Sequence, residues 1–186
     1  MLGSSADFVC RVPAETRPTP TRRGDVDCKT RAKALLVHQT CLFMTTDEII
    51  AALNHLAIAS SEDYAQLDRL DELTVQLQQN HDGQLACAAM LHVLERHPQV
   101  AFGAPGQLVH AIESYHGHYE NLLVTSLDCQ PTATTVWMLN RLINAAIGPE
   151  KDQLRAQMHR LRTHPRADEQ AQAAAEEFDR FQTGEA

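Results

Sequence analysis

The chain has 186 residues, of which 44% are hydrophobic, 22% are charged and only 5% are aromatic. This length and composition suit one globular domain, and no apolar run reaches the roughly 18 residues that a membrane-spanning helix needs. The formal net charge of −8 disfavours nucleic acid and anionic membranes as partners, because both bind basic surfaces.

The charge and the residue pattern divide the chain at Met44. Residues 1–43 carry a net charge of +3, contain three prolines and show no sustained apolar period, whereas residues 44–186 carry −11. We predict that residues 1–43 are a disordered basic leader, because such a segment buries too little surface to offset its ordering entropy. It is either upstream sequence before a natural start at Met44 or a regulatory tail.

The cysteines and the N-terminal residues bear on the compartment. Five cysteines, an odd number without Cys-x-x-Cys spacing, indicate neither a disulfide framework nor a zinc site. Arg22 and Arg23 are followed by Gly24 and Asp25 where an export signal would need an apolar stretch. We therefore predict a cytoplasmic protein without a cofactor.

From Met44 onward, apolar residues recur at helical spacing and turn residues separate them into about eight helices. The first begins at a predicted capping box formed by Thr45 and Glu48. The expected helices run approximately from Asp47 to Ile58, from just after Ser61 to Leu77, and then over Gln84 to Arg96, Gln107 to Tyr115, Tyr119 to Leu127, Thr134 to Ile147, Glu150 to Arg162 and Ala167 to Phe181. Their apolar stripes include Tyr64, Leu85 and Ile147.

Short connections between helices of about three turns favour antiparallel hairpins that bury their stripes against one another. The predicted fold is therefore all-α, with about eight helices as stacked antiparallel hairpins in a HEAT-like short α-solenoid over residues 44–186. No repeat of fixed period is legible in the sequence, so a compact helical bundle is the alternative.

Histidines and acids cluster where two of the expected helices meet. His110 and Glu113 lie at positions i and i+3 of one helix, and His116 and His118 follow. These side chains suggest a metal site, but solvated or helix-capping roles are the favoured interpretation. Cys87 lies inside the most apolar helix and is predicted to be an inert core residue.

A second polar cluster lies on the helix that contains Trp137, Asn140, Arg141 and Asn144. A charge among apolar neighbours needs a partner, and Glu113 is the predicted partner of Arg141. We interpret both clusters as a structural brace between hairpins, with the asparagines tying a loop backbone, rather than as a ligand site. No G-x-S-x-G elbow, phosphate-binding loop or H-E-x-x-H motif occurs, so we do not expect an enzyme.

The stretches Leu108–Tyr115, Tyr119–Leu123 and Val136–Asn144 resemble the helical immunity proteins of bacterial polymorphic toxin and contact-dependent inhibition systems. The likeness covers about Asp47 to Leu161. It implies a protein that binds and neutralises a cognate toxin domain and has no catalytic residues of its own. The positions that match the family pattern, namely His110, Glu113, Trp137, Arg141 and Asn144, look like scaffold.

The negative charge of residues 44–186 favours a basic toxin domain as the partner. The candidate partner-binding residues are acids and aromatics that precede or begin the expected helices or lie in their outer positions, namely Glu62, Asp63, Asp68, Asp71, Tyr115, Tyr119 and Glu120. Two alternatives remain: a metal-dependent or small-molecule helical enzyme that uses the histidine cluster, and a general helical-repeat adaptor.

Overall fold

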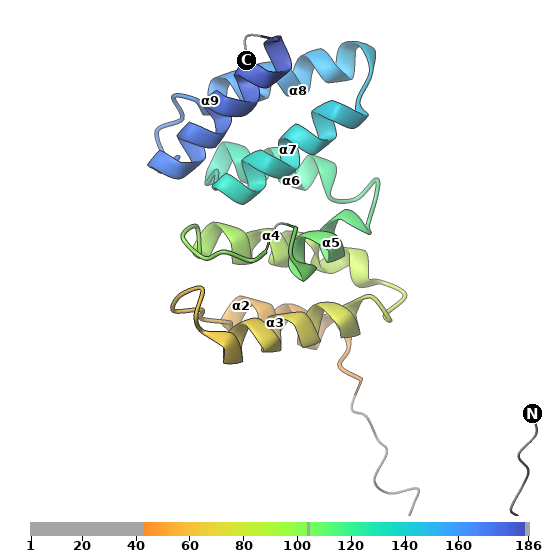
Figure 1. Cartoon of the computed structure of the whole chain (residues 1–186). Helices are drawn as coiled ribbons and strands as arrows, with labels where there is room; N and C mark the ends of the chain where they lie inside the picture. The colour runs from red at the N-terminus through yellow and green to blue at the C-terminus, as the bar shows by residue number, and fades with distance from the viewer. Residues whose placement is uncertain (1–42, 104, 185–186) are drawn as a thin grey trace, which may run out of the picture. The chain divides into compact units, whose positions relative to one another are not determined.

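The computed structural model describes residues 43–103 and 105–184, and the predicted basic leader lies outside them except for Phe43. The described residues form eight α-helices and one short 3₁₀-helix and contain no strand, which confirms the predicted all-α class (Figure 1). The elements are α2 (Thr46–His55), α3 (Tyr64–Leu77), η1 (Gly83–Ala86), α4 (Cys87–Arg96), α5 (Gln107–Glu113), α6 (Glu120–Cys129), α7 (Ala133–Ala145), α8 (Gly148–Leu161) and α9 (Glu169–Thr183).

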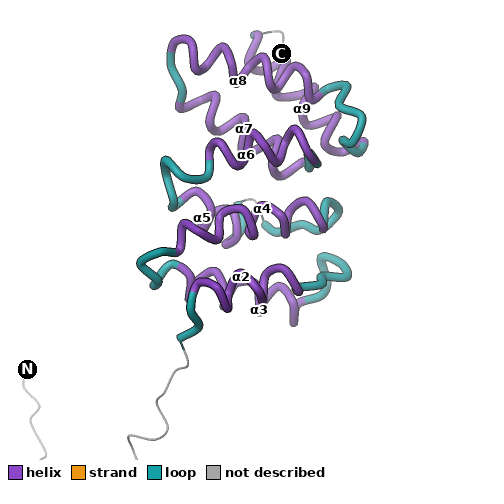
Figure 2. Tube along the Cα trace, turned by 180° about the vertical axis from the view of Figure 1, so that it is seen from behind, coloured by secondary structure: helices purple, strands orange, loops and turns teal. Residues whose placement is uncertain are grey.

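Successive helices pair into hairpins, and the hairpins stack in chain order (Figures 1 and 2). The first layer is α2 with α3, the second α4 with α5, the third α6 with α7, and the fourth α8 with α9. Between layers, α2 packs on α4, α3 packs on α5, and α4 packs on α6. Helix α7 packs against both α8 and α9. The fold is thus the predicted stack of hairpins rather than a bundle around one axis.

The first helix begins where the sequence predicts and ends earlier. The Thr45 amide donates to the Glu48 carboxylate at 2.8 Å, and the Glu48 amide donates to the Thr45 hydroxyl at 3.3 Å, which confirms the capping box. Helix α2 stops at His55, not near Ile58. Its last carbonyls are instead bound by Arg96 of the second layer.

Three apolar residues that were predicted to face the core are exposed: Tyr64 by 69%, Leu85 by 63% and Ile147 by 83%. Tyr64 is the first residue of α3, so no preceding turn covers it. Leu85 lies in η1, where three residues per turn shift the side-chain phase away from that of an α-helix. Ile147 follows the end of α7 at Ala145. Each error came from assuming a regular, covered α-helical period at or beyond the terminus of a helix.

An aliphatic core runs through the stack and includes fully buried leucines from α2, α4, α6 and α7, among them Leu53, Leu94, Leu127 and Leu139. Cys87 at the start of α4 is also fully buried, and burial is the main cause that raises the pKa of its thiol to about 11. The predicted inert core position of Cys87 is confirmed. Among the described residues, no helix is both long enough and apolar enough to cross a bilayer.

Polar contacts also join the layers. Within the first layer, the Thr46 hydroxyl donates to the Asp82 carboxylate, and the Asn80 side-chain amide donates to the Met44 carbonyl at 3.1 Å. Between the first two layers, the Tyr115 hydroxyl donates to the Leu77 carbonyl at the end of α3, at 3.2 Å. These bonds fix how the turn after α3 lies against its neighbours.

Candidate functional site

The predicted ion pair between α5 and α7 is present. The Nε and Nη2 atoms of Arg141 donate to the two carboxylate oxygens of Glu113 at 2.7 and 3.0 Å. The Arg141 guanidinium carbon also lies 4.9 Å from the centre of the Trp137 ring. This paired geometry with a cation–π contact holds the guanidinium in one place. The Arg141 side chain is 48% exposed and that of Glu113 is 13% exposed, so the pair lies at the surface edge of the core.

The asparagines of α7 contact a helix rather than a loop. The side-chain amide of Gln182 on α9 donates to Asn140 and to Asn144, each at 2.7 Å. The expectation that they tie a loop backbone is therefore wrong, because α9 returns along α7 and places Gln182 between them. His110 is exposed and has no hydrogen bond or ion pair with another described side chain, so it is not part of the brace that was predicted to include it.

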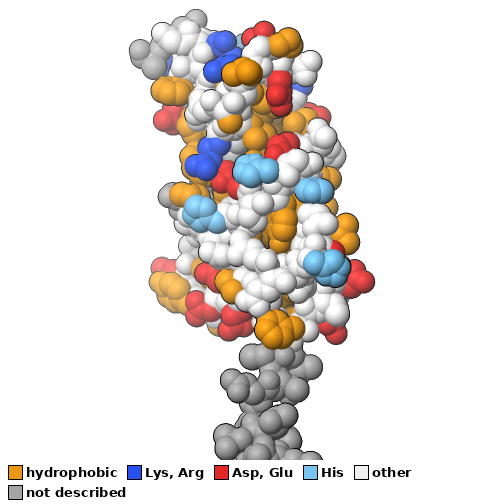
Figure 3. Space-filling model, turned by 90° about the vertical axis from the view of Figure 1, so that its right-hand side faces the viewer, with side chains coloured by type: hydrophobic (Ala, Val, Ile, Leu, Met, Phe, Trp, Pro, Cys, Tyr) orange, Lys and Arg blue, Asp and Glu red, His pale blue; other side chains and the backbone are white. Residues whose placement is uncertain are grey.

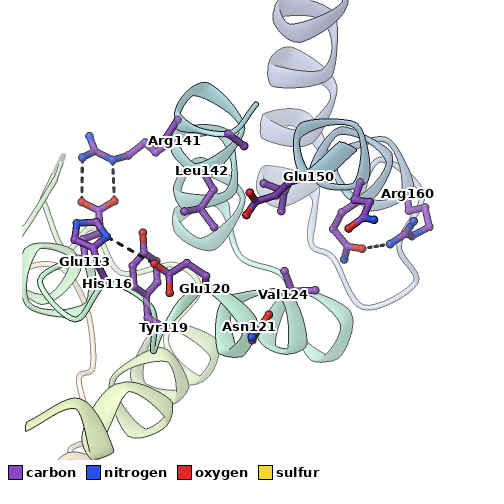
Figure 4. A pocket seen from close by; sticks show the side chains of 15 residues that line it. Glu113, His116, Tyr119, Glu120, Asn121, Val124, Arg141, Leu142, Glu150 and Arg160 are labelled. Atoms are coloured by element: carbon purple, nitrogen blue, oxygen red, sulfur yellow. Dashed lines mark hydrogen bonds and ion pairs between the residues drawn. The ribbon is translucent and has the colours of Figure 1, made fainter. Parts of the chain in front are cut away.

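A groove lies beside this brace, between α6, α7 and α8 (Figure 4). Its volume is about 610 Å³. Val124, Leu142 and Leu154 form apolar walls, and Ala145 and Ala146 leave room at the end of α7. Polar side chains also line it, namely Glu113, His116, Tyr119, Glu120, Asn121, Arg141, Glu150, Gln153, Gln157 and Arg160.

Tyr119 lies at the base of this groove. The residue is only 3% exposed, yet its hydroxyl points into the groove and has no hydrogen-bond partner among the described residues (Figure 4). Burial, and then the nearby carboxylates of Glu113 and Glu120, raise its pKa to about 12, and Arg141 opposes them. The hydroxyl is therefore protonated at neutral pH and can donate one hydrogen bond as well as accept one.

The two other acids of the groove differ in their local contacts. Glu120 accepts a hydrogen bond from the Gly117 amide at 3.0 Å and lies 3.6 Å from His116. Glu150 is an exposed residue in the first turn of α8, where the helix dipole favours a negative charge. The hydrogen bond and the ion pair of Glu120 both use its Oε1 atom, and Glu150 has no hydrogen bond or ion pair among the described residues.

The candidate partner-binding residues fall into two places. Glu62, Asp63, Asp68 and Asp71 lie on α3 or just before it, whereas Tyr115, Tyr119 and Glu120 lie at the turn between α5 and α6. The Asp63 carboxylate already accepts a hydrogen bond from the nearby Ala59 amide, at 3.1 Å.

The exposed tyrosine of the structure is not one of the two that were predicted to contact a partner. Tyr115 and Tyr119 are largely internal, since the hydroxyl of the first bonds a backbone carbonyl and the second is buried. Tyr64, which was predicted to be in the core, is the exposed tyrosine. Tyr64, Asp68 and Asp71 lie at positions i, i+4 and i+7 of α3 and so share one face. Partial burial, and then repulsion from Asp68, raise the pKa of Asp71.

Most of the negative charge of the described residues belongs to the first layer. Residues 44–82 contain eight acids and one arginine, a net charge of −7, whereas residues 83–184 contain eleven acids and eight basic residues, a net charge of −3. Figure 3 shows acidic side chains gathered around the end of the stack that the first layer forms. We call the exposed acids Glu62, Asp68 and Asp71, together with Tyr64, the α3 face.

Within the described residues, no group of three or more His, Cys, Asp or Glu side chains is arranged to hold a metal ion. The histidines at the α5–α6 turn, His116 and His118, are exposed. Comparison with known proteins finds no matching family model, no matching curated protein and no matching solved structure.

The groove and the exposed position of Tyr64 were not predicted from the sequence, whereas the acids of the α3 face were. The groove between α6 and α8 depends on contacts between helices separated by many residues, and no local pattern indicates it. The sequence does contain a pattern that indicates the exposed position of Tyr64. Tyr64, Asp68 and Asp71 are interspersed with the inward-facing leucines Leu67 and Leu70. The i, i+4, i+7 spacing of the three outer residues distinguishes them from that stripe.

Proposed function

We propose that this chain is a binding protein of the immunity type, which associates with a basic toxin domain and neutralises it without catalysing a reaction. The observation that carries the proposal is the concentration of charge on the first layer, a net −7 over residues 44–82, next to the exposed ring of Tyr64. The assignment of the partner as a toxin domain rests on the resemblance of residues 47–161 to helical immunity proteins.

The physical argument concerns association rate and affinity. A charged face attracts a partner of opposite charge and raises the association rate constant above the unsteered range of about 10⁵–10⁶ M⁻¹s⁻¹. An exposed tyrosine surrounded by polar residues is a common anchor at the centre of an interface, because it buries a large area with few rotatable bonds. The α3 face combines both features on one helix.

The test is co-expression with the toxin C-terminal domain encoded beside the gene for this chain. We expect rescue of growth, co-purification of the two proteins, and an association rate constant that falls as salt concentration rises. A neighbouring toxin that is neither bound nor neutralised would contradict the proposal. An isolated gene without such a neighbour would favour the general adaptor instead.

A charge-matched pair of variants locates the surface. Asp68→Asn/Asp71→Asn removes two charges from the α3 face, and Glu176→Gln/Glu177→Gln removes two exposed charges from α9. We expect the first variant to slow association by about 3- to 10-fold and the second to change it less than 2-fold. Equal effects of the two variants, measured by stopped-flow fluorescence, would show that the α3 face has no special part in binding.

A further inference from the structure

The groove between α6, α7 and α8 has a tyrosine hydroxyl at its base that makes no hydrogen bond within the described residues. Tyr119 is 3% exposed and has no hydrogen-bond partner among the described residues, although its hydroxyl points into the groove (Figure 4). The hydroxyl oxygen is not among the fully buried side-chain atoms that lack a partner, so it remains open to the groove. It can therefore form a hydrogen bond with a ligand atom that enters the groove.

The charges that line the groove favour a cationic ligand. Three carboxylates line it, those of Glu113, Glu120 and Glu150, with the guanidinium groups of Arg141 and Arg160. Arg141 is neutralised by Glu113, as their two hydrogen bonds show. The remaining charges are two carboxylates and Arg160, and Arg160 donates to the Gln157 side chain. An anion entering the groove would meet this excess of carboxylates.

The walls of the groove fit the stem of a long basic side chain. Val124 on α6, Leu142 on α7 and Leu154 on α8 face the groove from three helices. Lysine and arginine side chains lay their methylene groups along apolar surface while the charged group reaches a polar partner. At about 610 Å³, the groove has room for such a side chain and the backbone on either side of it.

We propose that this groove binds a lysine or arginine side chain of the partner polypeptide, with its stem against Val124, Leu142 and Leu154 and its cation at the Tyr119 hydroxyl and the Glu120 carboxylate. The inference deepens the proposed function, because it rests on a basic polypeptide partner and names where one of its side chains is held. The Tyr119 hydroxyl accepts a hydrogen bond from the cation, and its own O–H group donates a hydrogen bond to a neighbouring carboxylate. The groove then contributes specificity, whereas the α3 face contributes association rate.

The first experiment uses a small probe and does not need the toxin. Nα-acetyl-arginine-N-methylamide is titrated into the full chain while the methyl resonances of Val124, Leu142 and Leu154 are followed by NMR. We expect saturable shifts with a dissociation constant on the order of 1–10 mM, as a single contact site gives. Nα-acetyl-glutamate-N-methylamide should produce no saturable shift of the same methyl groups.

Two conservative variants test the named atoms. Tyr119→Phe keeps the ring and removes the hydroxyl, and Glu120→Gln keeps an oxygen for the Gly117 amide but removes the charge. Each should weaken binding of the arginine probe by about 10-fold, since each removes a hydrogen bond to a charged group. Glu169→Gln, in the first turn of α9 and outside the groove lining, is the matched control and should leave it unchanged.

The outcomes separate this inference from the proposed function. If the arginine probe gives no saturable shift, if the acidic probe shifts the same methyl groups equally, or if both variants bind as the parent does, the groove proposal is overturned. A toxin domain that binds the parent and both variants with equal affinity overturns it as well and leaves the proposed function intact. Saturable arginine binding that the variants weaken, without any toxin binding, supports the groove and contradicts the toxin assignment.

Discussion

Arg96 shows how a residue of the second layer ends a helix of the first. Its guanidinium donates to the carbonyls of Leu53, Asn54 and Leu56 at 2.7, 2.9 and 3.1 Å. The last carbonyls of any helix lack intrahelical partners and carry partial negative charge, so a cation at this end satisfies both needs. Arg96 therefore holds α4 to the C-terminal end of α2 as well as ending that helix.

We expect Arg96→Ala to destabilise the fold by about 1.5–3 kcal/mol, because it removes charge-assisted hydrogen bonds to three carbonyls at the end of α2, and two of these bonds are partly buried. Urea denaturation followed by circular dichroism measures the change. Arg180→Ala is the control, since Arg180 is exposed and its side chain bonds only a carbonyl of its own helix, that of Glu176. It should stay within about 0.5 kcal/mol of the parent. A similar loss for both variants would remove the special role of Arg96.

Asp82 makes the stability of the first layer depend on pH. The hydrogen bond from the Thr46 hydroxyl is the largest cause that lowers the pKa of Asp82, and desolvation opposes it. A carboxyl group with a lowered pKa in the folded state stabilises the fold above its unfolded pKa of about 3.9. That stabilisation is lost as the pH falls through the lower folded pKa.

The variant Asp82→Asn cannot titrate at this position, so its stability should fall less than that of the parent between about pH 6 and pH 3. Urea midpoints measured across this range provide the comparison. Glu48, whose pKa is lowered mainly by hydrogen bonding to Thr45, leaves a remaining acid-dependent loss in the variant. Parallel pH profiles for parent and variant would contradict the assigned role of Asp82.

Helix α7 joins the third and fourth layers of the stack. It packs against α6, α8 and α9, and its side chains also reach α5 through Arg141 and α9 through Asn140 and Asn144. A change in the core of α7 therefore disturbs the third and fourth layers together. The groove shares this helix, so its shape depends on the same packing.

A matched pair of substitutions on and just beyond α7 measures this effect. Ile143 is fully buried, whereas Ile147 is 83% exposed. Ile143→Ala should cost about 2–5 kcal/mol, the range for a large-to-small change in a core, and Ile147→Ala less than about 0.5 kcal/mol. Chemical denaturation distinguishes them directly. Equal losses would mean that Ile147 packs against something in solution.

The contacts between layers show what the sequence could and could not predict. The number of α-helices and the order of the hairpins could be predicted, because apolar spacing and turn residues are local features of the sequence. The end of a helix can depend on a partner elsewhere, as the capping of α2 by Arg96 shows. The Glu113–Arg141 pair could be predicted from the sequence because a half-buried charge requires an opposite charge. The contacts of Gln182 with Asn140 and Asn144 could not, because they depend on how α9 folds back along α7.

At the scale of the whole stack, the net charge differs from one layer to the next. The first layer carries a net charge of −7, whereas the last three layers together carry −3, from eleven acids and eight basic residues. A partner with one basic face is therefore drawn toward one end of the stack. The groove lies between the third and fourth layers, so the two proposed contacts require a partner that spans part of the stack.

Anion-exchange chromatography tests this asymmetry without a partner. Neutralising four exposed acids of the first layer should lower the salt concentration needed for elution more than neutralising four exposed acids of the fourth layer, although both variants have equal net charge. Adsorption responds to local charge density as well as to net charge. The two sets are Asp47, Glu62, Asp68 and Asp71 in the first layer, and Asp152, Glu169, Glu176 and Glu177 in the fourth. Identical elution would contradict an oriented charge distribution.

The hydrogen bond between Tyr115 and the end of α3 restricts which residues can occupy position 83. A Cβ atom added to Gly83 would lie 2.2 Å from the Tyr115 hydroxyl and 2.6 Å from the Leu77 carbonyl. Even alanine would therefore break the bond between the first two layers, so the constraint is spatial rather than conformational. In a saturation mutagenesis library selected for folding, position 83 should tolerate as few replacements as a buried leucine does, although it contributes no side chain.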